Sequence, residues 1–313
     1  MQISRIHLTL LAVFWIINNA QGQQAFTQKI PISGLDSNQI KAYFKNTIDY
    51  IGKSKKDRKE FRKQSENQSP SLFSNMPTFA LYGIGNLNTV QQFEELNGSG
   101  KLAGYFRLFS SPKSFATAFF SYNRNASNSD SLLASTFLFP DVGQSSFAGT
   151  LEWAFLLGTP RRKYTGGRDQ INMFFSIPFF EFANKMIKGK ANASDTEDLY
   201  FSTLMYTFGN RIQFSMHRYE DDASFSLSPY LSFVNIPNED NNAYRSVFGD
   251  EELPSMISSW GIKVVFQYND FQIFADLKNV MNVSAKDGNE RVRAIQGFNS
   301  NIGIVFNAQI FAR

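Results

Sequence analysis

The stretch Arg211-Ile212-Gln213-Phe214-Ser215-Met216-His217 alternates polar and apolar side chains one for one. The segments 224–233 and 260–268 follow the same pattern. A period of two places one set of side chains on each face of a β-strand. Most of the sequence from residue 77 onward consists of such segments, which predicts an all-β fold.

The composition indicates which kind of β-protein this is. The sequence holds 33 Phe and 12 Tyr, yet its mean hydropathy is −0.27. Beyond the first 22 residues no segment approaches 18 uninterrupted apolar residues, so spanning helices are not expected. Abundant aromatics in a chain that is hydrophilic on average are typical of a transmembrane β-barrel, with lipid outside and water inside. A soluble β-sandwich also alternates, but the dominance of Phe over Val and the long strand segments favour the barrel.

Residues 1–22 have the layout of a secretory signal peptide. Arg5 and His7 precede the apolar run 8–17, which is too short to span a bilayer. A small, polar exit follows, and we expect cleavage after Gly22. The alternative, an anchoring helix, needs about 20 apolar residues. The sequence has no Cys, so disulfides and thiolate metal sites are excluded.

Residues 23–76 are expected to form an N-terminal periplasmic segment. Asp36 and Gln39 have the spacing of a capping box, and an apolar stripe at helical spacing follows, which predicts a short amphipathic helix over 37–52. Residues 53–75 are basic and polar and predict a tether. The net charge of +4 includes no basic stripe on a nucleic-acid-binding fold, so we expect no nucleic-acid partner.

Residues 77–313 are predicted to form an antiparallel up-and-down barrel of about twelve strands. The predicted strands are 77–87, 101–109, 114–122, 132–139, 147–157, 170–182, 198–208, 211–219, 223–235, 257–268, 271–280 and 299–311. With both termini in the periplasm, turns on that side should be short and outer loops longer. Two connections break this rule, because 209–210 is a short outer turn and 183–197 is a long inner one.

The alternation also assigns the two faces of the sheet. A charge on the lipid face at mid-bilayer costs about 2–4 kcal/mol, so the charged set is expected to face the lumen. The predicted lumen-lining residues are Lys101, Arg107, Glu152, Arg211, Gln213, His217, Lys263, Asp276 and Lys278. The aromatic residues expected at the membrane interfaces are Trp153, Trp260, Tyr122, Tyr206 and Tyr268.

The last predicted strand contains Asn301-Ile302-Gly303-Ile304-Val305-Phe306-Asn307-Ala308-Gln309-Ile310-Phe311. It resembles the terminal strand of Gram-negative outer-membrane β-barrel proteins, which carries a glycine, alternating apolar residues and late aromatics. The resemblance covers residues 77–313 as a pattern. It implies an outer-membrane location and an assembly signal formed by Gly303, Phe306 and Phe311, read by the barrel assembly machinery. The sequence departs from the pattern by ending on Ala312-Arg313 instead of an aromatic residue.

Three functions are compatible with these observations. The first is a narrow channel or facilitator for small polar or anionic solutes, because opposed charges in the lumen can line a pore; they can equally brace a closed core. The second is a non-transporting barrel that anchors or assists an envelope or secretion complex through the N-terminal helix. The third, much weaker, is an outer-membrane lipase using Ser215 and His217, which lack an evident acidic partner. We expect no enzyme activity, cofactor or metal; outer-membrane lipid is an expected partner.

The resemblance of the last strand generates a testable prediction. Deletion of residues 299–313 should abolish membrane insertion, because the assembly signal and one wall of the barrel are lost together. The measurement is outer-membrane fractionation with heat-modifiable migration on gels, compared with the full chain. Normal insertion of the truncated chain would remove the argument.

Overall fold

The computed structural model describes residues 79–90, 95–110, 114–124, 133–139, 145–165, 168–191, 197–218, 222–269, 271–285 and 289–312. The predicted signal peptide, the helix over 37–52 and the tether all lie outside these residues and remain predictions. Among the described residues, no helix is long and apolar enough to cross a membrane.

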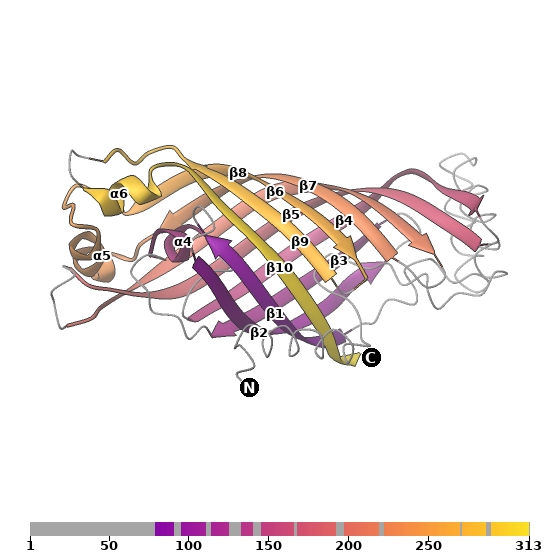
Figure 1. The fold of residues 1–313 in the computed structure, drawn as a ribbon, viewed down its shortest axis with the longest axis horizontal. Helices are drawn as coiled ribbons and strands as arrows, with labels where there is room; N and C mark the ends of the chain where they lie inside the picture. Colours follow the sequence, from indigo (N-terminus) through magenta and orange to yellow (C-terminus); the bar gives the residue numbers. More distant parts are fainter. Residues whose placement is uncertain are drawn as a thin grey trace, which may run out of the picture.

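Ten strands and four short helical segments make up the described chain (Figure 1). The strands are β1 (Phe79–Val90), β2 (Glu95–Ser110), β3 (Ser114–Arg124), β4 (Ser145–Thr165), β5 (Arg168–Gly189), β6 (Leu199–Arg218), β7 (Asp222–Asn235), β8 (Met256–Tyr268), β9 (Phe271–Val280) and β10 (Gly297–Ala312). The helices are α4 (Leu133–Leu138), the 3₁₀ turn η2 (Asn238–Asp240), α5 (Asn241–Phe248) and α6 (Glu290–Ile295).

The strands form a closed antiparallel barrel in sequence order. Each strand pairs with its neighbour along the chain, and β1 also pairs with β10. The closing ladder runs from Val90 opposite Asn301 to Ala80 opposite Ala312, with one irregularity near Leu81. Closure gives every strand two partners, so the sheet has no free lateral edge along this ladder.

The predicted strand over 132–139 is wrong, because these residues contain helix α4. Its buried apolar residues are Leu133, Ala134, Phe137 and Leu138, which recur at a spacing of about four instead of two. Pro140 follows one residue after Phe139, and the residue before a proline is disfavoured in helical conformation, so the helix ends there.

The predicted turn at 209–210 is also wrong, because β6 runs through it without a break. Inward-facing residues keep the same parity on both sides, from Met205 and Thr207 to Arg211 and Gln213. Gly209 serves close packing instead, since a Cβ there would lie 2.5 Å from Phe179 Cζ. One helix and one merged strand reduce the predicted twelve strands to the ten observed.

These two corrections restore the regular loop pattern. The turns after β2, β4, β6 and β8 hold two or three residues each, at the end of the barrel that also carries β1's start and β10's end. We call this the short-turn end. The connections that carry α4, α5 and α6, together with 190–198, lie at the opposite, helix-bearing end (Figure 1). The segment 183–197 is therefore not a long inner connection.

The strands differ in length, and one hairpin projects beyond its neighbours. β4 and β5 have 21 and 22 residues, whereas β9 has 10. β3 pairs with β4 only as far as Ser114 and Phe155, while the ladder between β4 and β5 continues to Thr165 and Arg168. The part of β4 after Phe155 thus keeps its β5 partner but has no described partner on the side of β3.

The outer face of the barrel is apolar. Its exposed side chains include Leu102, Phe106, Leu151, Phe155, Phe174, Phe208, Leu231, Phe266, Ile273 and Leu277. The five aromatic residues expected at interfaces, Trp153, Trp260, Tyr122, Tyr206 and Tyr268, are all exposed as well. Along β9 and β4, exposed residues alternate with buried ones, as the period of two requires.

An inward-facing glycine lets a large aromatic residue lie flat against the wall. Tyr230 on β7 pairs across the strand with Gly261 on β8. A Cβ at Gly261 would lie 2.3 Å from Tyr230 Cζ and 2.7 Å from the backbone oxygen of Leu277. The second neighbour is backbone and cannot rotate away, so this position requires glycine.

Gly261→Ala should therefore destabilise the barrel by about 1–3 kcal/mol, the usual range for overpacking. Gly104→Ala is the matched control, because its Cβ would come no closer than 3.3 Å to Phe120 Cδ2. Urea midpoints in lipid vesicles, followed by the compact band on gels, report both variants. Equal midpoints for the two variants would contradict the packing argument.

Candidate functional site

The barrel interior carries most of the residues predicted to line a lumen. Glu152, Arg211, Gln213, Asp276 and Lys278 are all buried on the inward parity of their strands. Arg107 and Lys263 are half-buried on the same parity, and Lys263 Nζ lies 5.0 Å from the centre of the inward Phe274 ring. The side chains of Lys101 and His217 are outside the described part of the chain.

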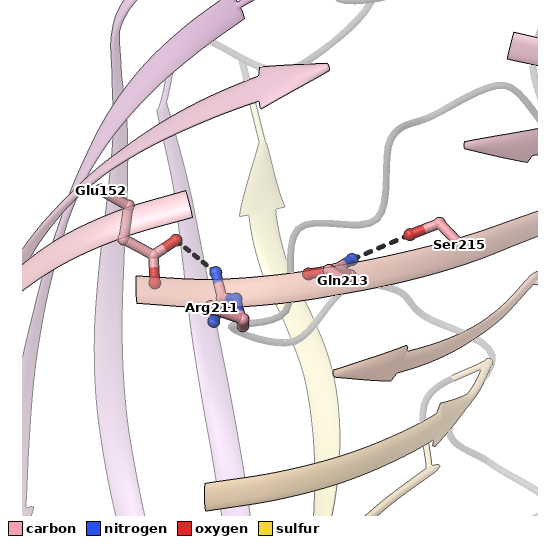
Figure 2. Close-up of polar contacts among 4 residues, drawn as sticks. All are labelled: Glu152, Arg211, Gln213 and Ser215. Carbon is pink, nitrogen blue, oxygen red and sulfur yellow. Dashed lines mark hydrogen bonds and ion pairs between the residues drawn. The ribbon is translucent and has the colours of Figure 1, made fainter. Parts of the chain in front are cut away.

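A buried ion pair crosses the inner wall between two strands that are not neighbours. Arg211 Nη2 on β6 donates to Glu152 Oε2 on β4 at 2.7 Å (Figure 2). Glu152 is level with Phe179, and Arg211 is level with Ile177, both on the intervening β5. The pair therefore spans β5 and links three strands. Such a contact braces the wall and neutralises two charges inside the barrel.

The remaining predicted residues of β6 form a polar row below this pair. Gln213 Nε2 donates to Ser215 Oγ at 2.9 Å, and both side chains are buried (Figure 2). The Ser215 hydroxyl is thus occupied by an amide, and the described side chains place no base beside it. Within the described residues no group of three or more His, Cys, Asp or Glu is placed to hold a metal.

A second polar contact lies on the opposite part of the ring. Tyr230 on β7 donates its hydroxyl to Asp276 Oδ1 on β9 at 2.5 Å, across the intervening β8. This contact repeats the pattern of the first, because a long inward side chain again bridges two strands over a third. The predicted charges Glu152, Arg211 and Asp276 all have partners within the wall.

The helix-bearing end of the barrel is filled by an apolar cluster. Helices α4, α5 and α6 contribute Phe137, Tyr244, Phe248, Val292 and Ile295, all at 0% or 1% exposure. They pack against inward residues of the wall, which include Ala183, Ile187, Phe201, Met205, Val234, Ile257 and Val280. We call this assembly the helical plug. Its centre is a group of rings, with Phe137 stacked on Tyr244 at 5.7 Å between centroids.

Two buried lysines attach the plug to the barrel wall. Lys185 Nζ on β5 donates to Thr136 O at 2.6 Å and also to Phe139 O. Lys278 Nζ on β9 donates to Leu138 O at 2.5 Å. These acceptors are carbonyl groups at the C-terminal end of α4, which have no partners within the helix itself. A cation at a helix C-terminus is also favoured by the helix dipole.

Helices α5 and α6 are joined to each other by a separate set of contacts. Asn289, the N-cap of α6, donates from Nδ2 to Phe248 O at 2.9 Å and to Gly249 O at 3.1 Å. Arg291 Nη1 donates to Val247 O at 2.5 Å and to Lys190 O in the connection after β5. Three connections at this end are therefore held together by two side chains. Burial raises the pKa of the Tyr244 hydroxyl, which stays protonated within the cluster.

Several buried polar atoms in the interior have no hydrogen-bond partner within the protein. They are Gln213 Oε1, Arg211 Nε, Ser226 Oγ and Asn301 Oδ1. Gln213 and Ser226 face each other across β6 and β7. An unsatisfied buried polar atom costs about 1–3 kcal/mol, so water is the partner expected at these positions.

The predicted assembly signal lies in β10, the strand that closes the barrel. Gly303 is buried and pairs with Asn88 of β1, and the ring of Phe306 lies 5.6 Å from that of Phe271. The side chain of Phe311 is not among those described. These positions place the signal in the closing ladder but do not test its recognition by an assembly machine.

Sequence reasoning missed Lys185 and the helical plug. The predicted strand ended at 182, whereas β5 continues to Gly189, so Lys185 was assigned to a connection. The alternation did hold the signal, because Ala183, Lys185 and Ile187 continue the inward parity of β5. The outer loop after β7 was expected to carry Tyr244 and Phe248 without a secondary structure, and they lie in α5.

Comparisons with known proteins give little further information. No protein-family model matches the sequence, and no curated protein matches it. Similar solved structures include OmpF of Salmonella typhi in complex with daunomycin, at 7% identity and a TM-score of 0.23, covering 75% of this chain and 98% of that chain. A substituted variant of the Rh. blastica porin has 7% identity and a TM-score of 0.20, covering 74% of this chain and 100% of that chain. TM-scores this low support no conclusion about this chain.

The buried ion pair makes a testable prediction about bracing. Arg211→Met leaves Glu152 buried without its partner and should destabilise the barrel by about 3–5 kcal/mol. The double variant Arg211→Met with Glu152→Leu should recover most of that loss, because no uncompensated charge remains. Urea midpoints in lipid vesicles measure both.

The control for that cycle is the more exposed pair Lys188–Asp198, whose charged atoms lie 2.7 Å apart with side chains 23% and 31% exposed. Lys188→Met should change the midpoint much less, since exposed pairs contribute little. If the Arg211 single variant and the double variant were equally unstable, the pair would not act as a brace.

Proposed function

We propose that this protein is an outer-membrane β-barrel that serves as a narrow channel or facilitator for small polar or anionic solutes, with the helical plug closing one end. The observation that carries the proposal is the combination of an apolar outer face with a polar interior whose buried atoms lack partners within the protein. Apolar side chains outside suit lipid, and unsatisfied polar atoms inside suit water.

The outer-membrane location is supported by the sidedness of the loops. Bacterial barrels have short periplasmic turns and longer outer loops. The short-turn end also carries the start of β1 and the end of β10, in keeping with termini in the periplasm. Expected partners of such a barrel are outer-membrane lipid and the barrel assembly machinery.

A hydrated interior is favoured over a dry, structural one by energetic reasoning. Four interior polar atoms without partners would together destabilise a dry core by several kcal/mol, at about 1–3 kcal/mol each. A passage that holds water removes this penalty. The apolar helical plug then limits solute flow, because polar solutes do not enter a cluster of packed aromatic rings.

The second candidate is a non-transporting barrel that anchors or assists an envelope complex. It is favoured by the Arg211–Glu152 and Tyr230–Asp276 contacts, which brace the wall. A barrel of ten strands is also only slightly wider than the eight-stranded case, in which side chains fill the interior. The predicted helix over 37–52 would be the element that binds a partner.

Conductance in planar bilayers separates the two candidates. The wild-type protein should show low conductance, whereas a variant with residues 125–144 replaced by a short Gly-Ser linker should conduct at least about tenfold more, because α4 no longer fills the mouth. The control replaces residues 91–94, a connection at the same end that carries no described helix. A folded, heat-modifiable plug-replacement variant that conducts no more than wild type would favour the non-transporting barrel.

A further inference from the structure

We propose that Lys185 and Lys278 form an oxyanion-binding site inside the barrel, and that the C-terminal carbonyl groups of α4 occupy it in the closed protein. A small solute with a carboxylate or phosphate group would compete with α4 for the two ammonium groups and release it. This inference rests on the proposed function, since the release of α4 matters only if the barrel forms a passage.

The two lysines converge on one short segment from distant parts of the wall. Lys185 belongs to β5 and Lys278 to β9, with three strands between them in a ring of ten. Their acceptors, Thr136 O, Leu138 O and Phe139 O, lie within four consecutive residues. Two cations that point at one place from separate strands make a site for negative charge.

The present occupant satisfies the lysines only partly. Lys185 and Lys278 are 1% and 2% exposed, and a buried ammonium group is costly unless charge or hydrogen bonds compensate it. Lys278 Nζ contacts the Leu138 carbonyl and lies 5.3 Å and 5.5 Å from the ring centres of Phe139 and Tyr230. These are neutral groups. An oxyanion would make charge-assisted hydrogen bonds, which are about twice as strong as neutral ones.

The nearby carboxylates bear on the selectivity of the site. Asp276 lies two residues before Lys278 on the same inward parity and accepts the hydroxyl of Tyr230 at 2.5 Å. Glu181 lies four residues before Lys185 and is half-buried. Both carboxylates repel anions, so a solute must engage both lysines at once to compete well. The site therefore favours a multidentate oxyanion over chloride.

Helix α4 is the part of the plug that such competition would free. Asn289 and Arg291 hold α5, α6 and the connection after β5 together without contacting the lysine site. The hydrogen bonds from the barrel wall to α4 come from Lys185 and Lys278. Loss of these bonds leaves α4 held by apolar packing alone, whereas the contacts between α5 and α6 persist.

The first test measures conductance of the full chain in planar bilayers at constant ionic strength. Replacing part of the chloride by inorganic phosphate, or in a separate arm by succinate, should raise the open probability at least about fivefold, the lower range of ordinary coupling between sites. The double variant Lys185→Met with Lys278→Met should lose the response. Lys188→Met is the matched control on the same strand, because its ammonium pairs with Asp198 at 2.7 Å, and it should respond like wild type.

The second test reads the position of α4 without relying on conductance. The chain has no cysteine, so Ala134→Cys introduces a single reactive thiol at a residue that is 5% exposed. A membrane-impermeant maleimide should label it slowly in chloride and at least about fivefold faster in phosphate or succinate. The same anions should not accelerate labelling when Lys185→Met and Lys278→Met are added.

The outcomes separate this inference from the proposed function. Labelling that is unchanged by both anions, or acceleration that persists without the two lysines, would overturn the oxyanion site. Faster labelling in a protein that never conducts, even with residues 125–144 replaced, would support the site while rejecting the channel. Response to only one of the two anions identifies phosphate or carboxylate as the chemistry recognised and supports the site.

Discussion

The closed ladder of backbone hydrogen bonds is the constraint on which the rest of this structure depends. A sheet whose outer face is apolar has no water on that side to satisfy a free strand edge, so it must pair its first strand with its last. The pairing of β1 with β10 meets this requirement. Once the ring is closed, the period of two forces every second residue into a narrow interior, whatever its polarity. The interior chemistry therefore follows from the need to coat the outside with apolar residues.

The interior manages its charges by linking strands that are not neighbours. Arg211 reaches Glu152 over β5, and Tyr230 reaches Asp276 over β8. Each contact resists relative shear of three strands, which neighbouring backbone ladders alone resist less well. The lysines at the helix-bearing end act differently, because they engage backbone carbonyls of an inserted loop. One half of the barrel is thus braced within its wall, and the other half is braced through the helical plug.

The sequence predicted the sheet better than it predicted what fills it. Alternation along β4, β6, β8 and β9 identified both faces, since a strand with lipid on one side tolerates few exceptions to the period of two. The errors arose where another requirement outweighed local signals. Gly209-Asn210 has the composition of a turn, but Phe179 needs the missing side chain for close packing. The apolar spacing around Phe137 was helical, and the short segment was assigned to a strand because the residues were rich in apolar side chains.

The contacts between the loops could not be predicted in the same way. Arg291 and Asn289 bind carbonyl groups of residues about forty to one hundred positions away, and backbone acceptors leave no trace in a sequence. Lys185 and Lys278 were visible as inward charges only if the strand boundaries were known to within a residue or two. Their acceptors on α4 became apparent only when the loop was placed in the mouth.

The uneven length of the strands fixes the depth at which the barrel sits in a bilayer. Beyond Phe155, β4 has no described partner on the side of β3, so the backbone groups along that side need water. Hydrocarbon cannot surround this stretch, and the boundary of the apolar layer must fall near the level where β3 begins. The hairpin of β4 and β5 would then stand in the aqueous space on the short-turn side, acting as a depth stop that prevents the barrel from sliding toward its helix-bearing end.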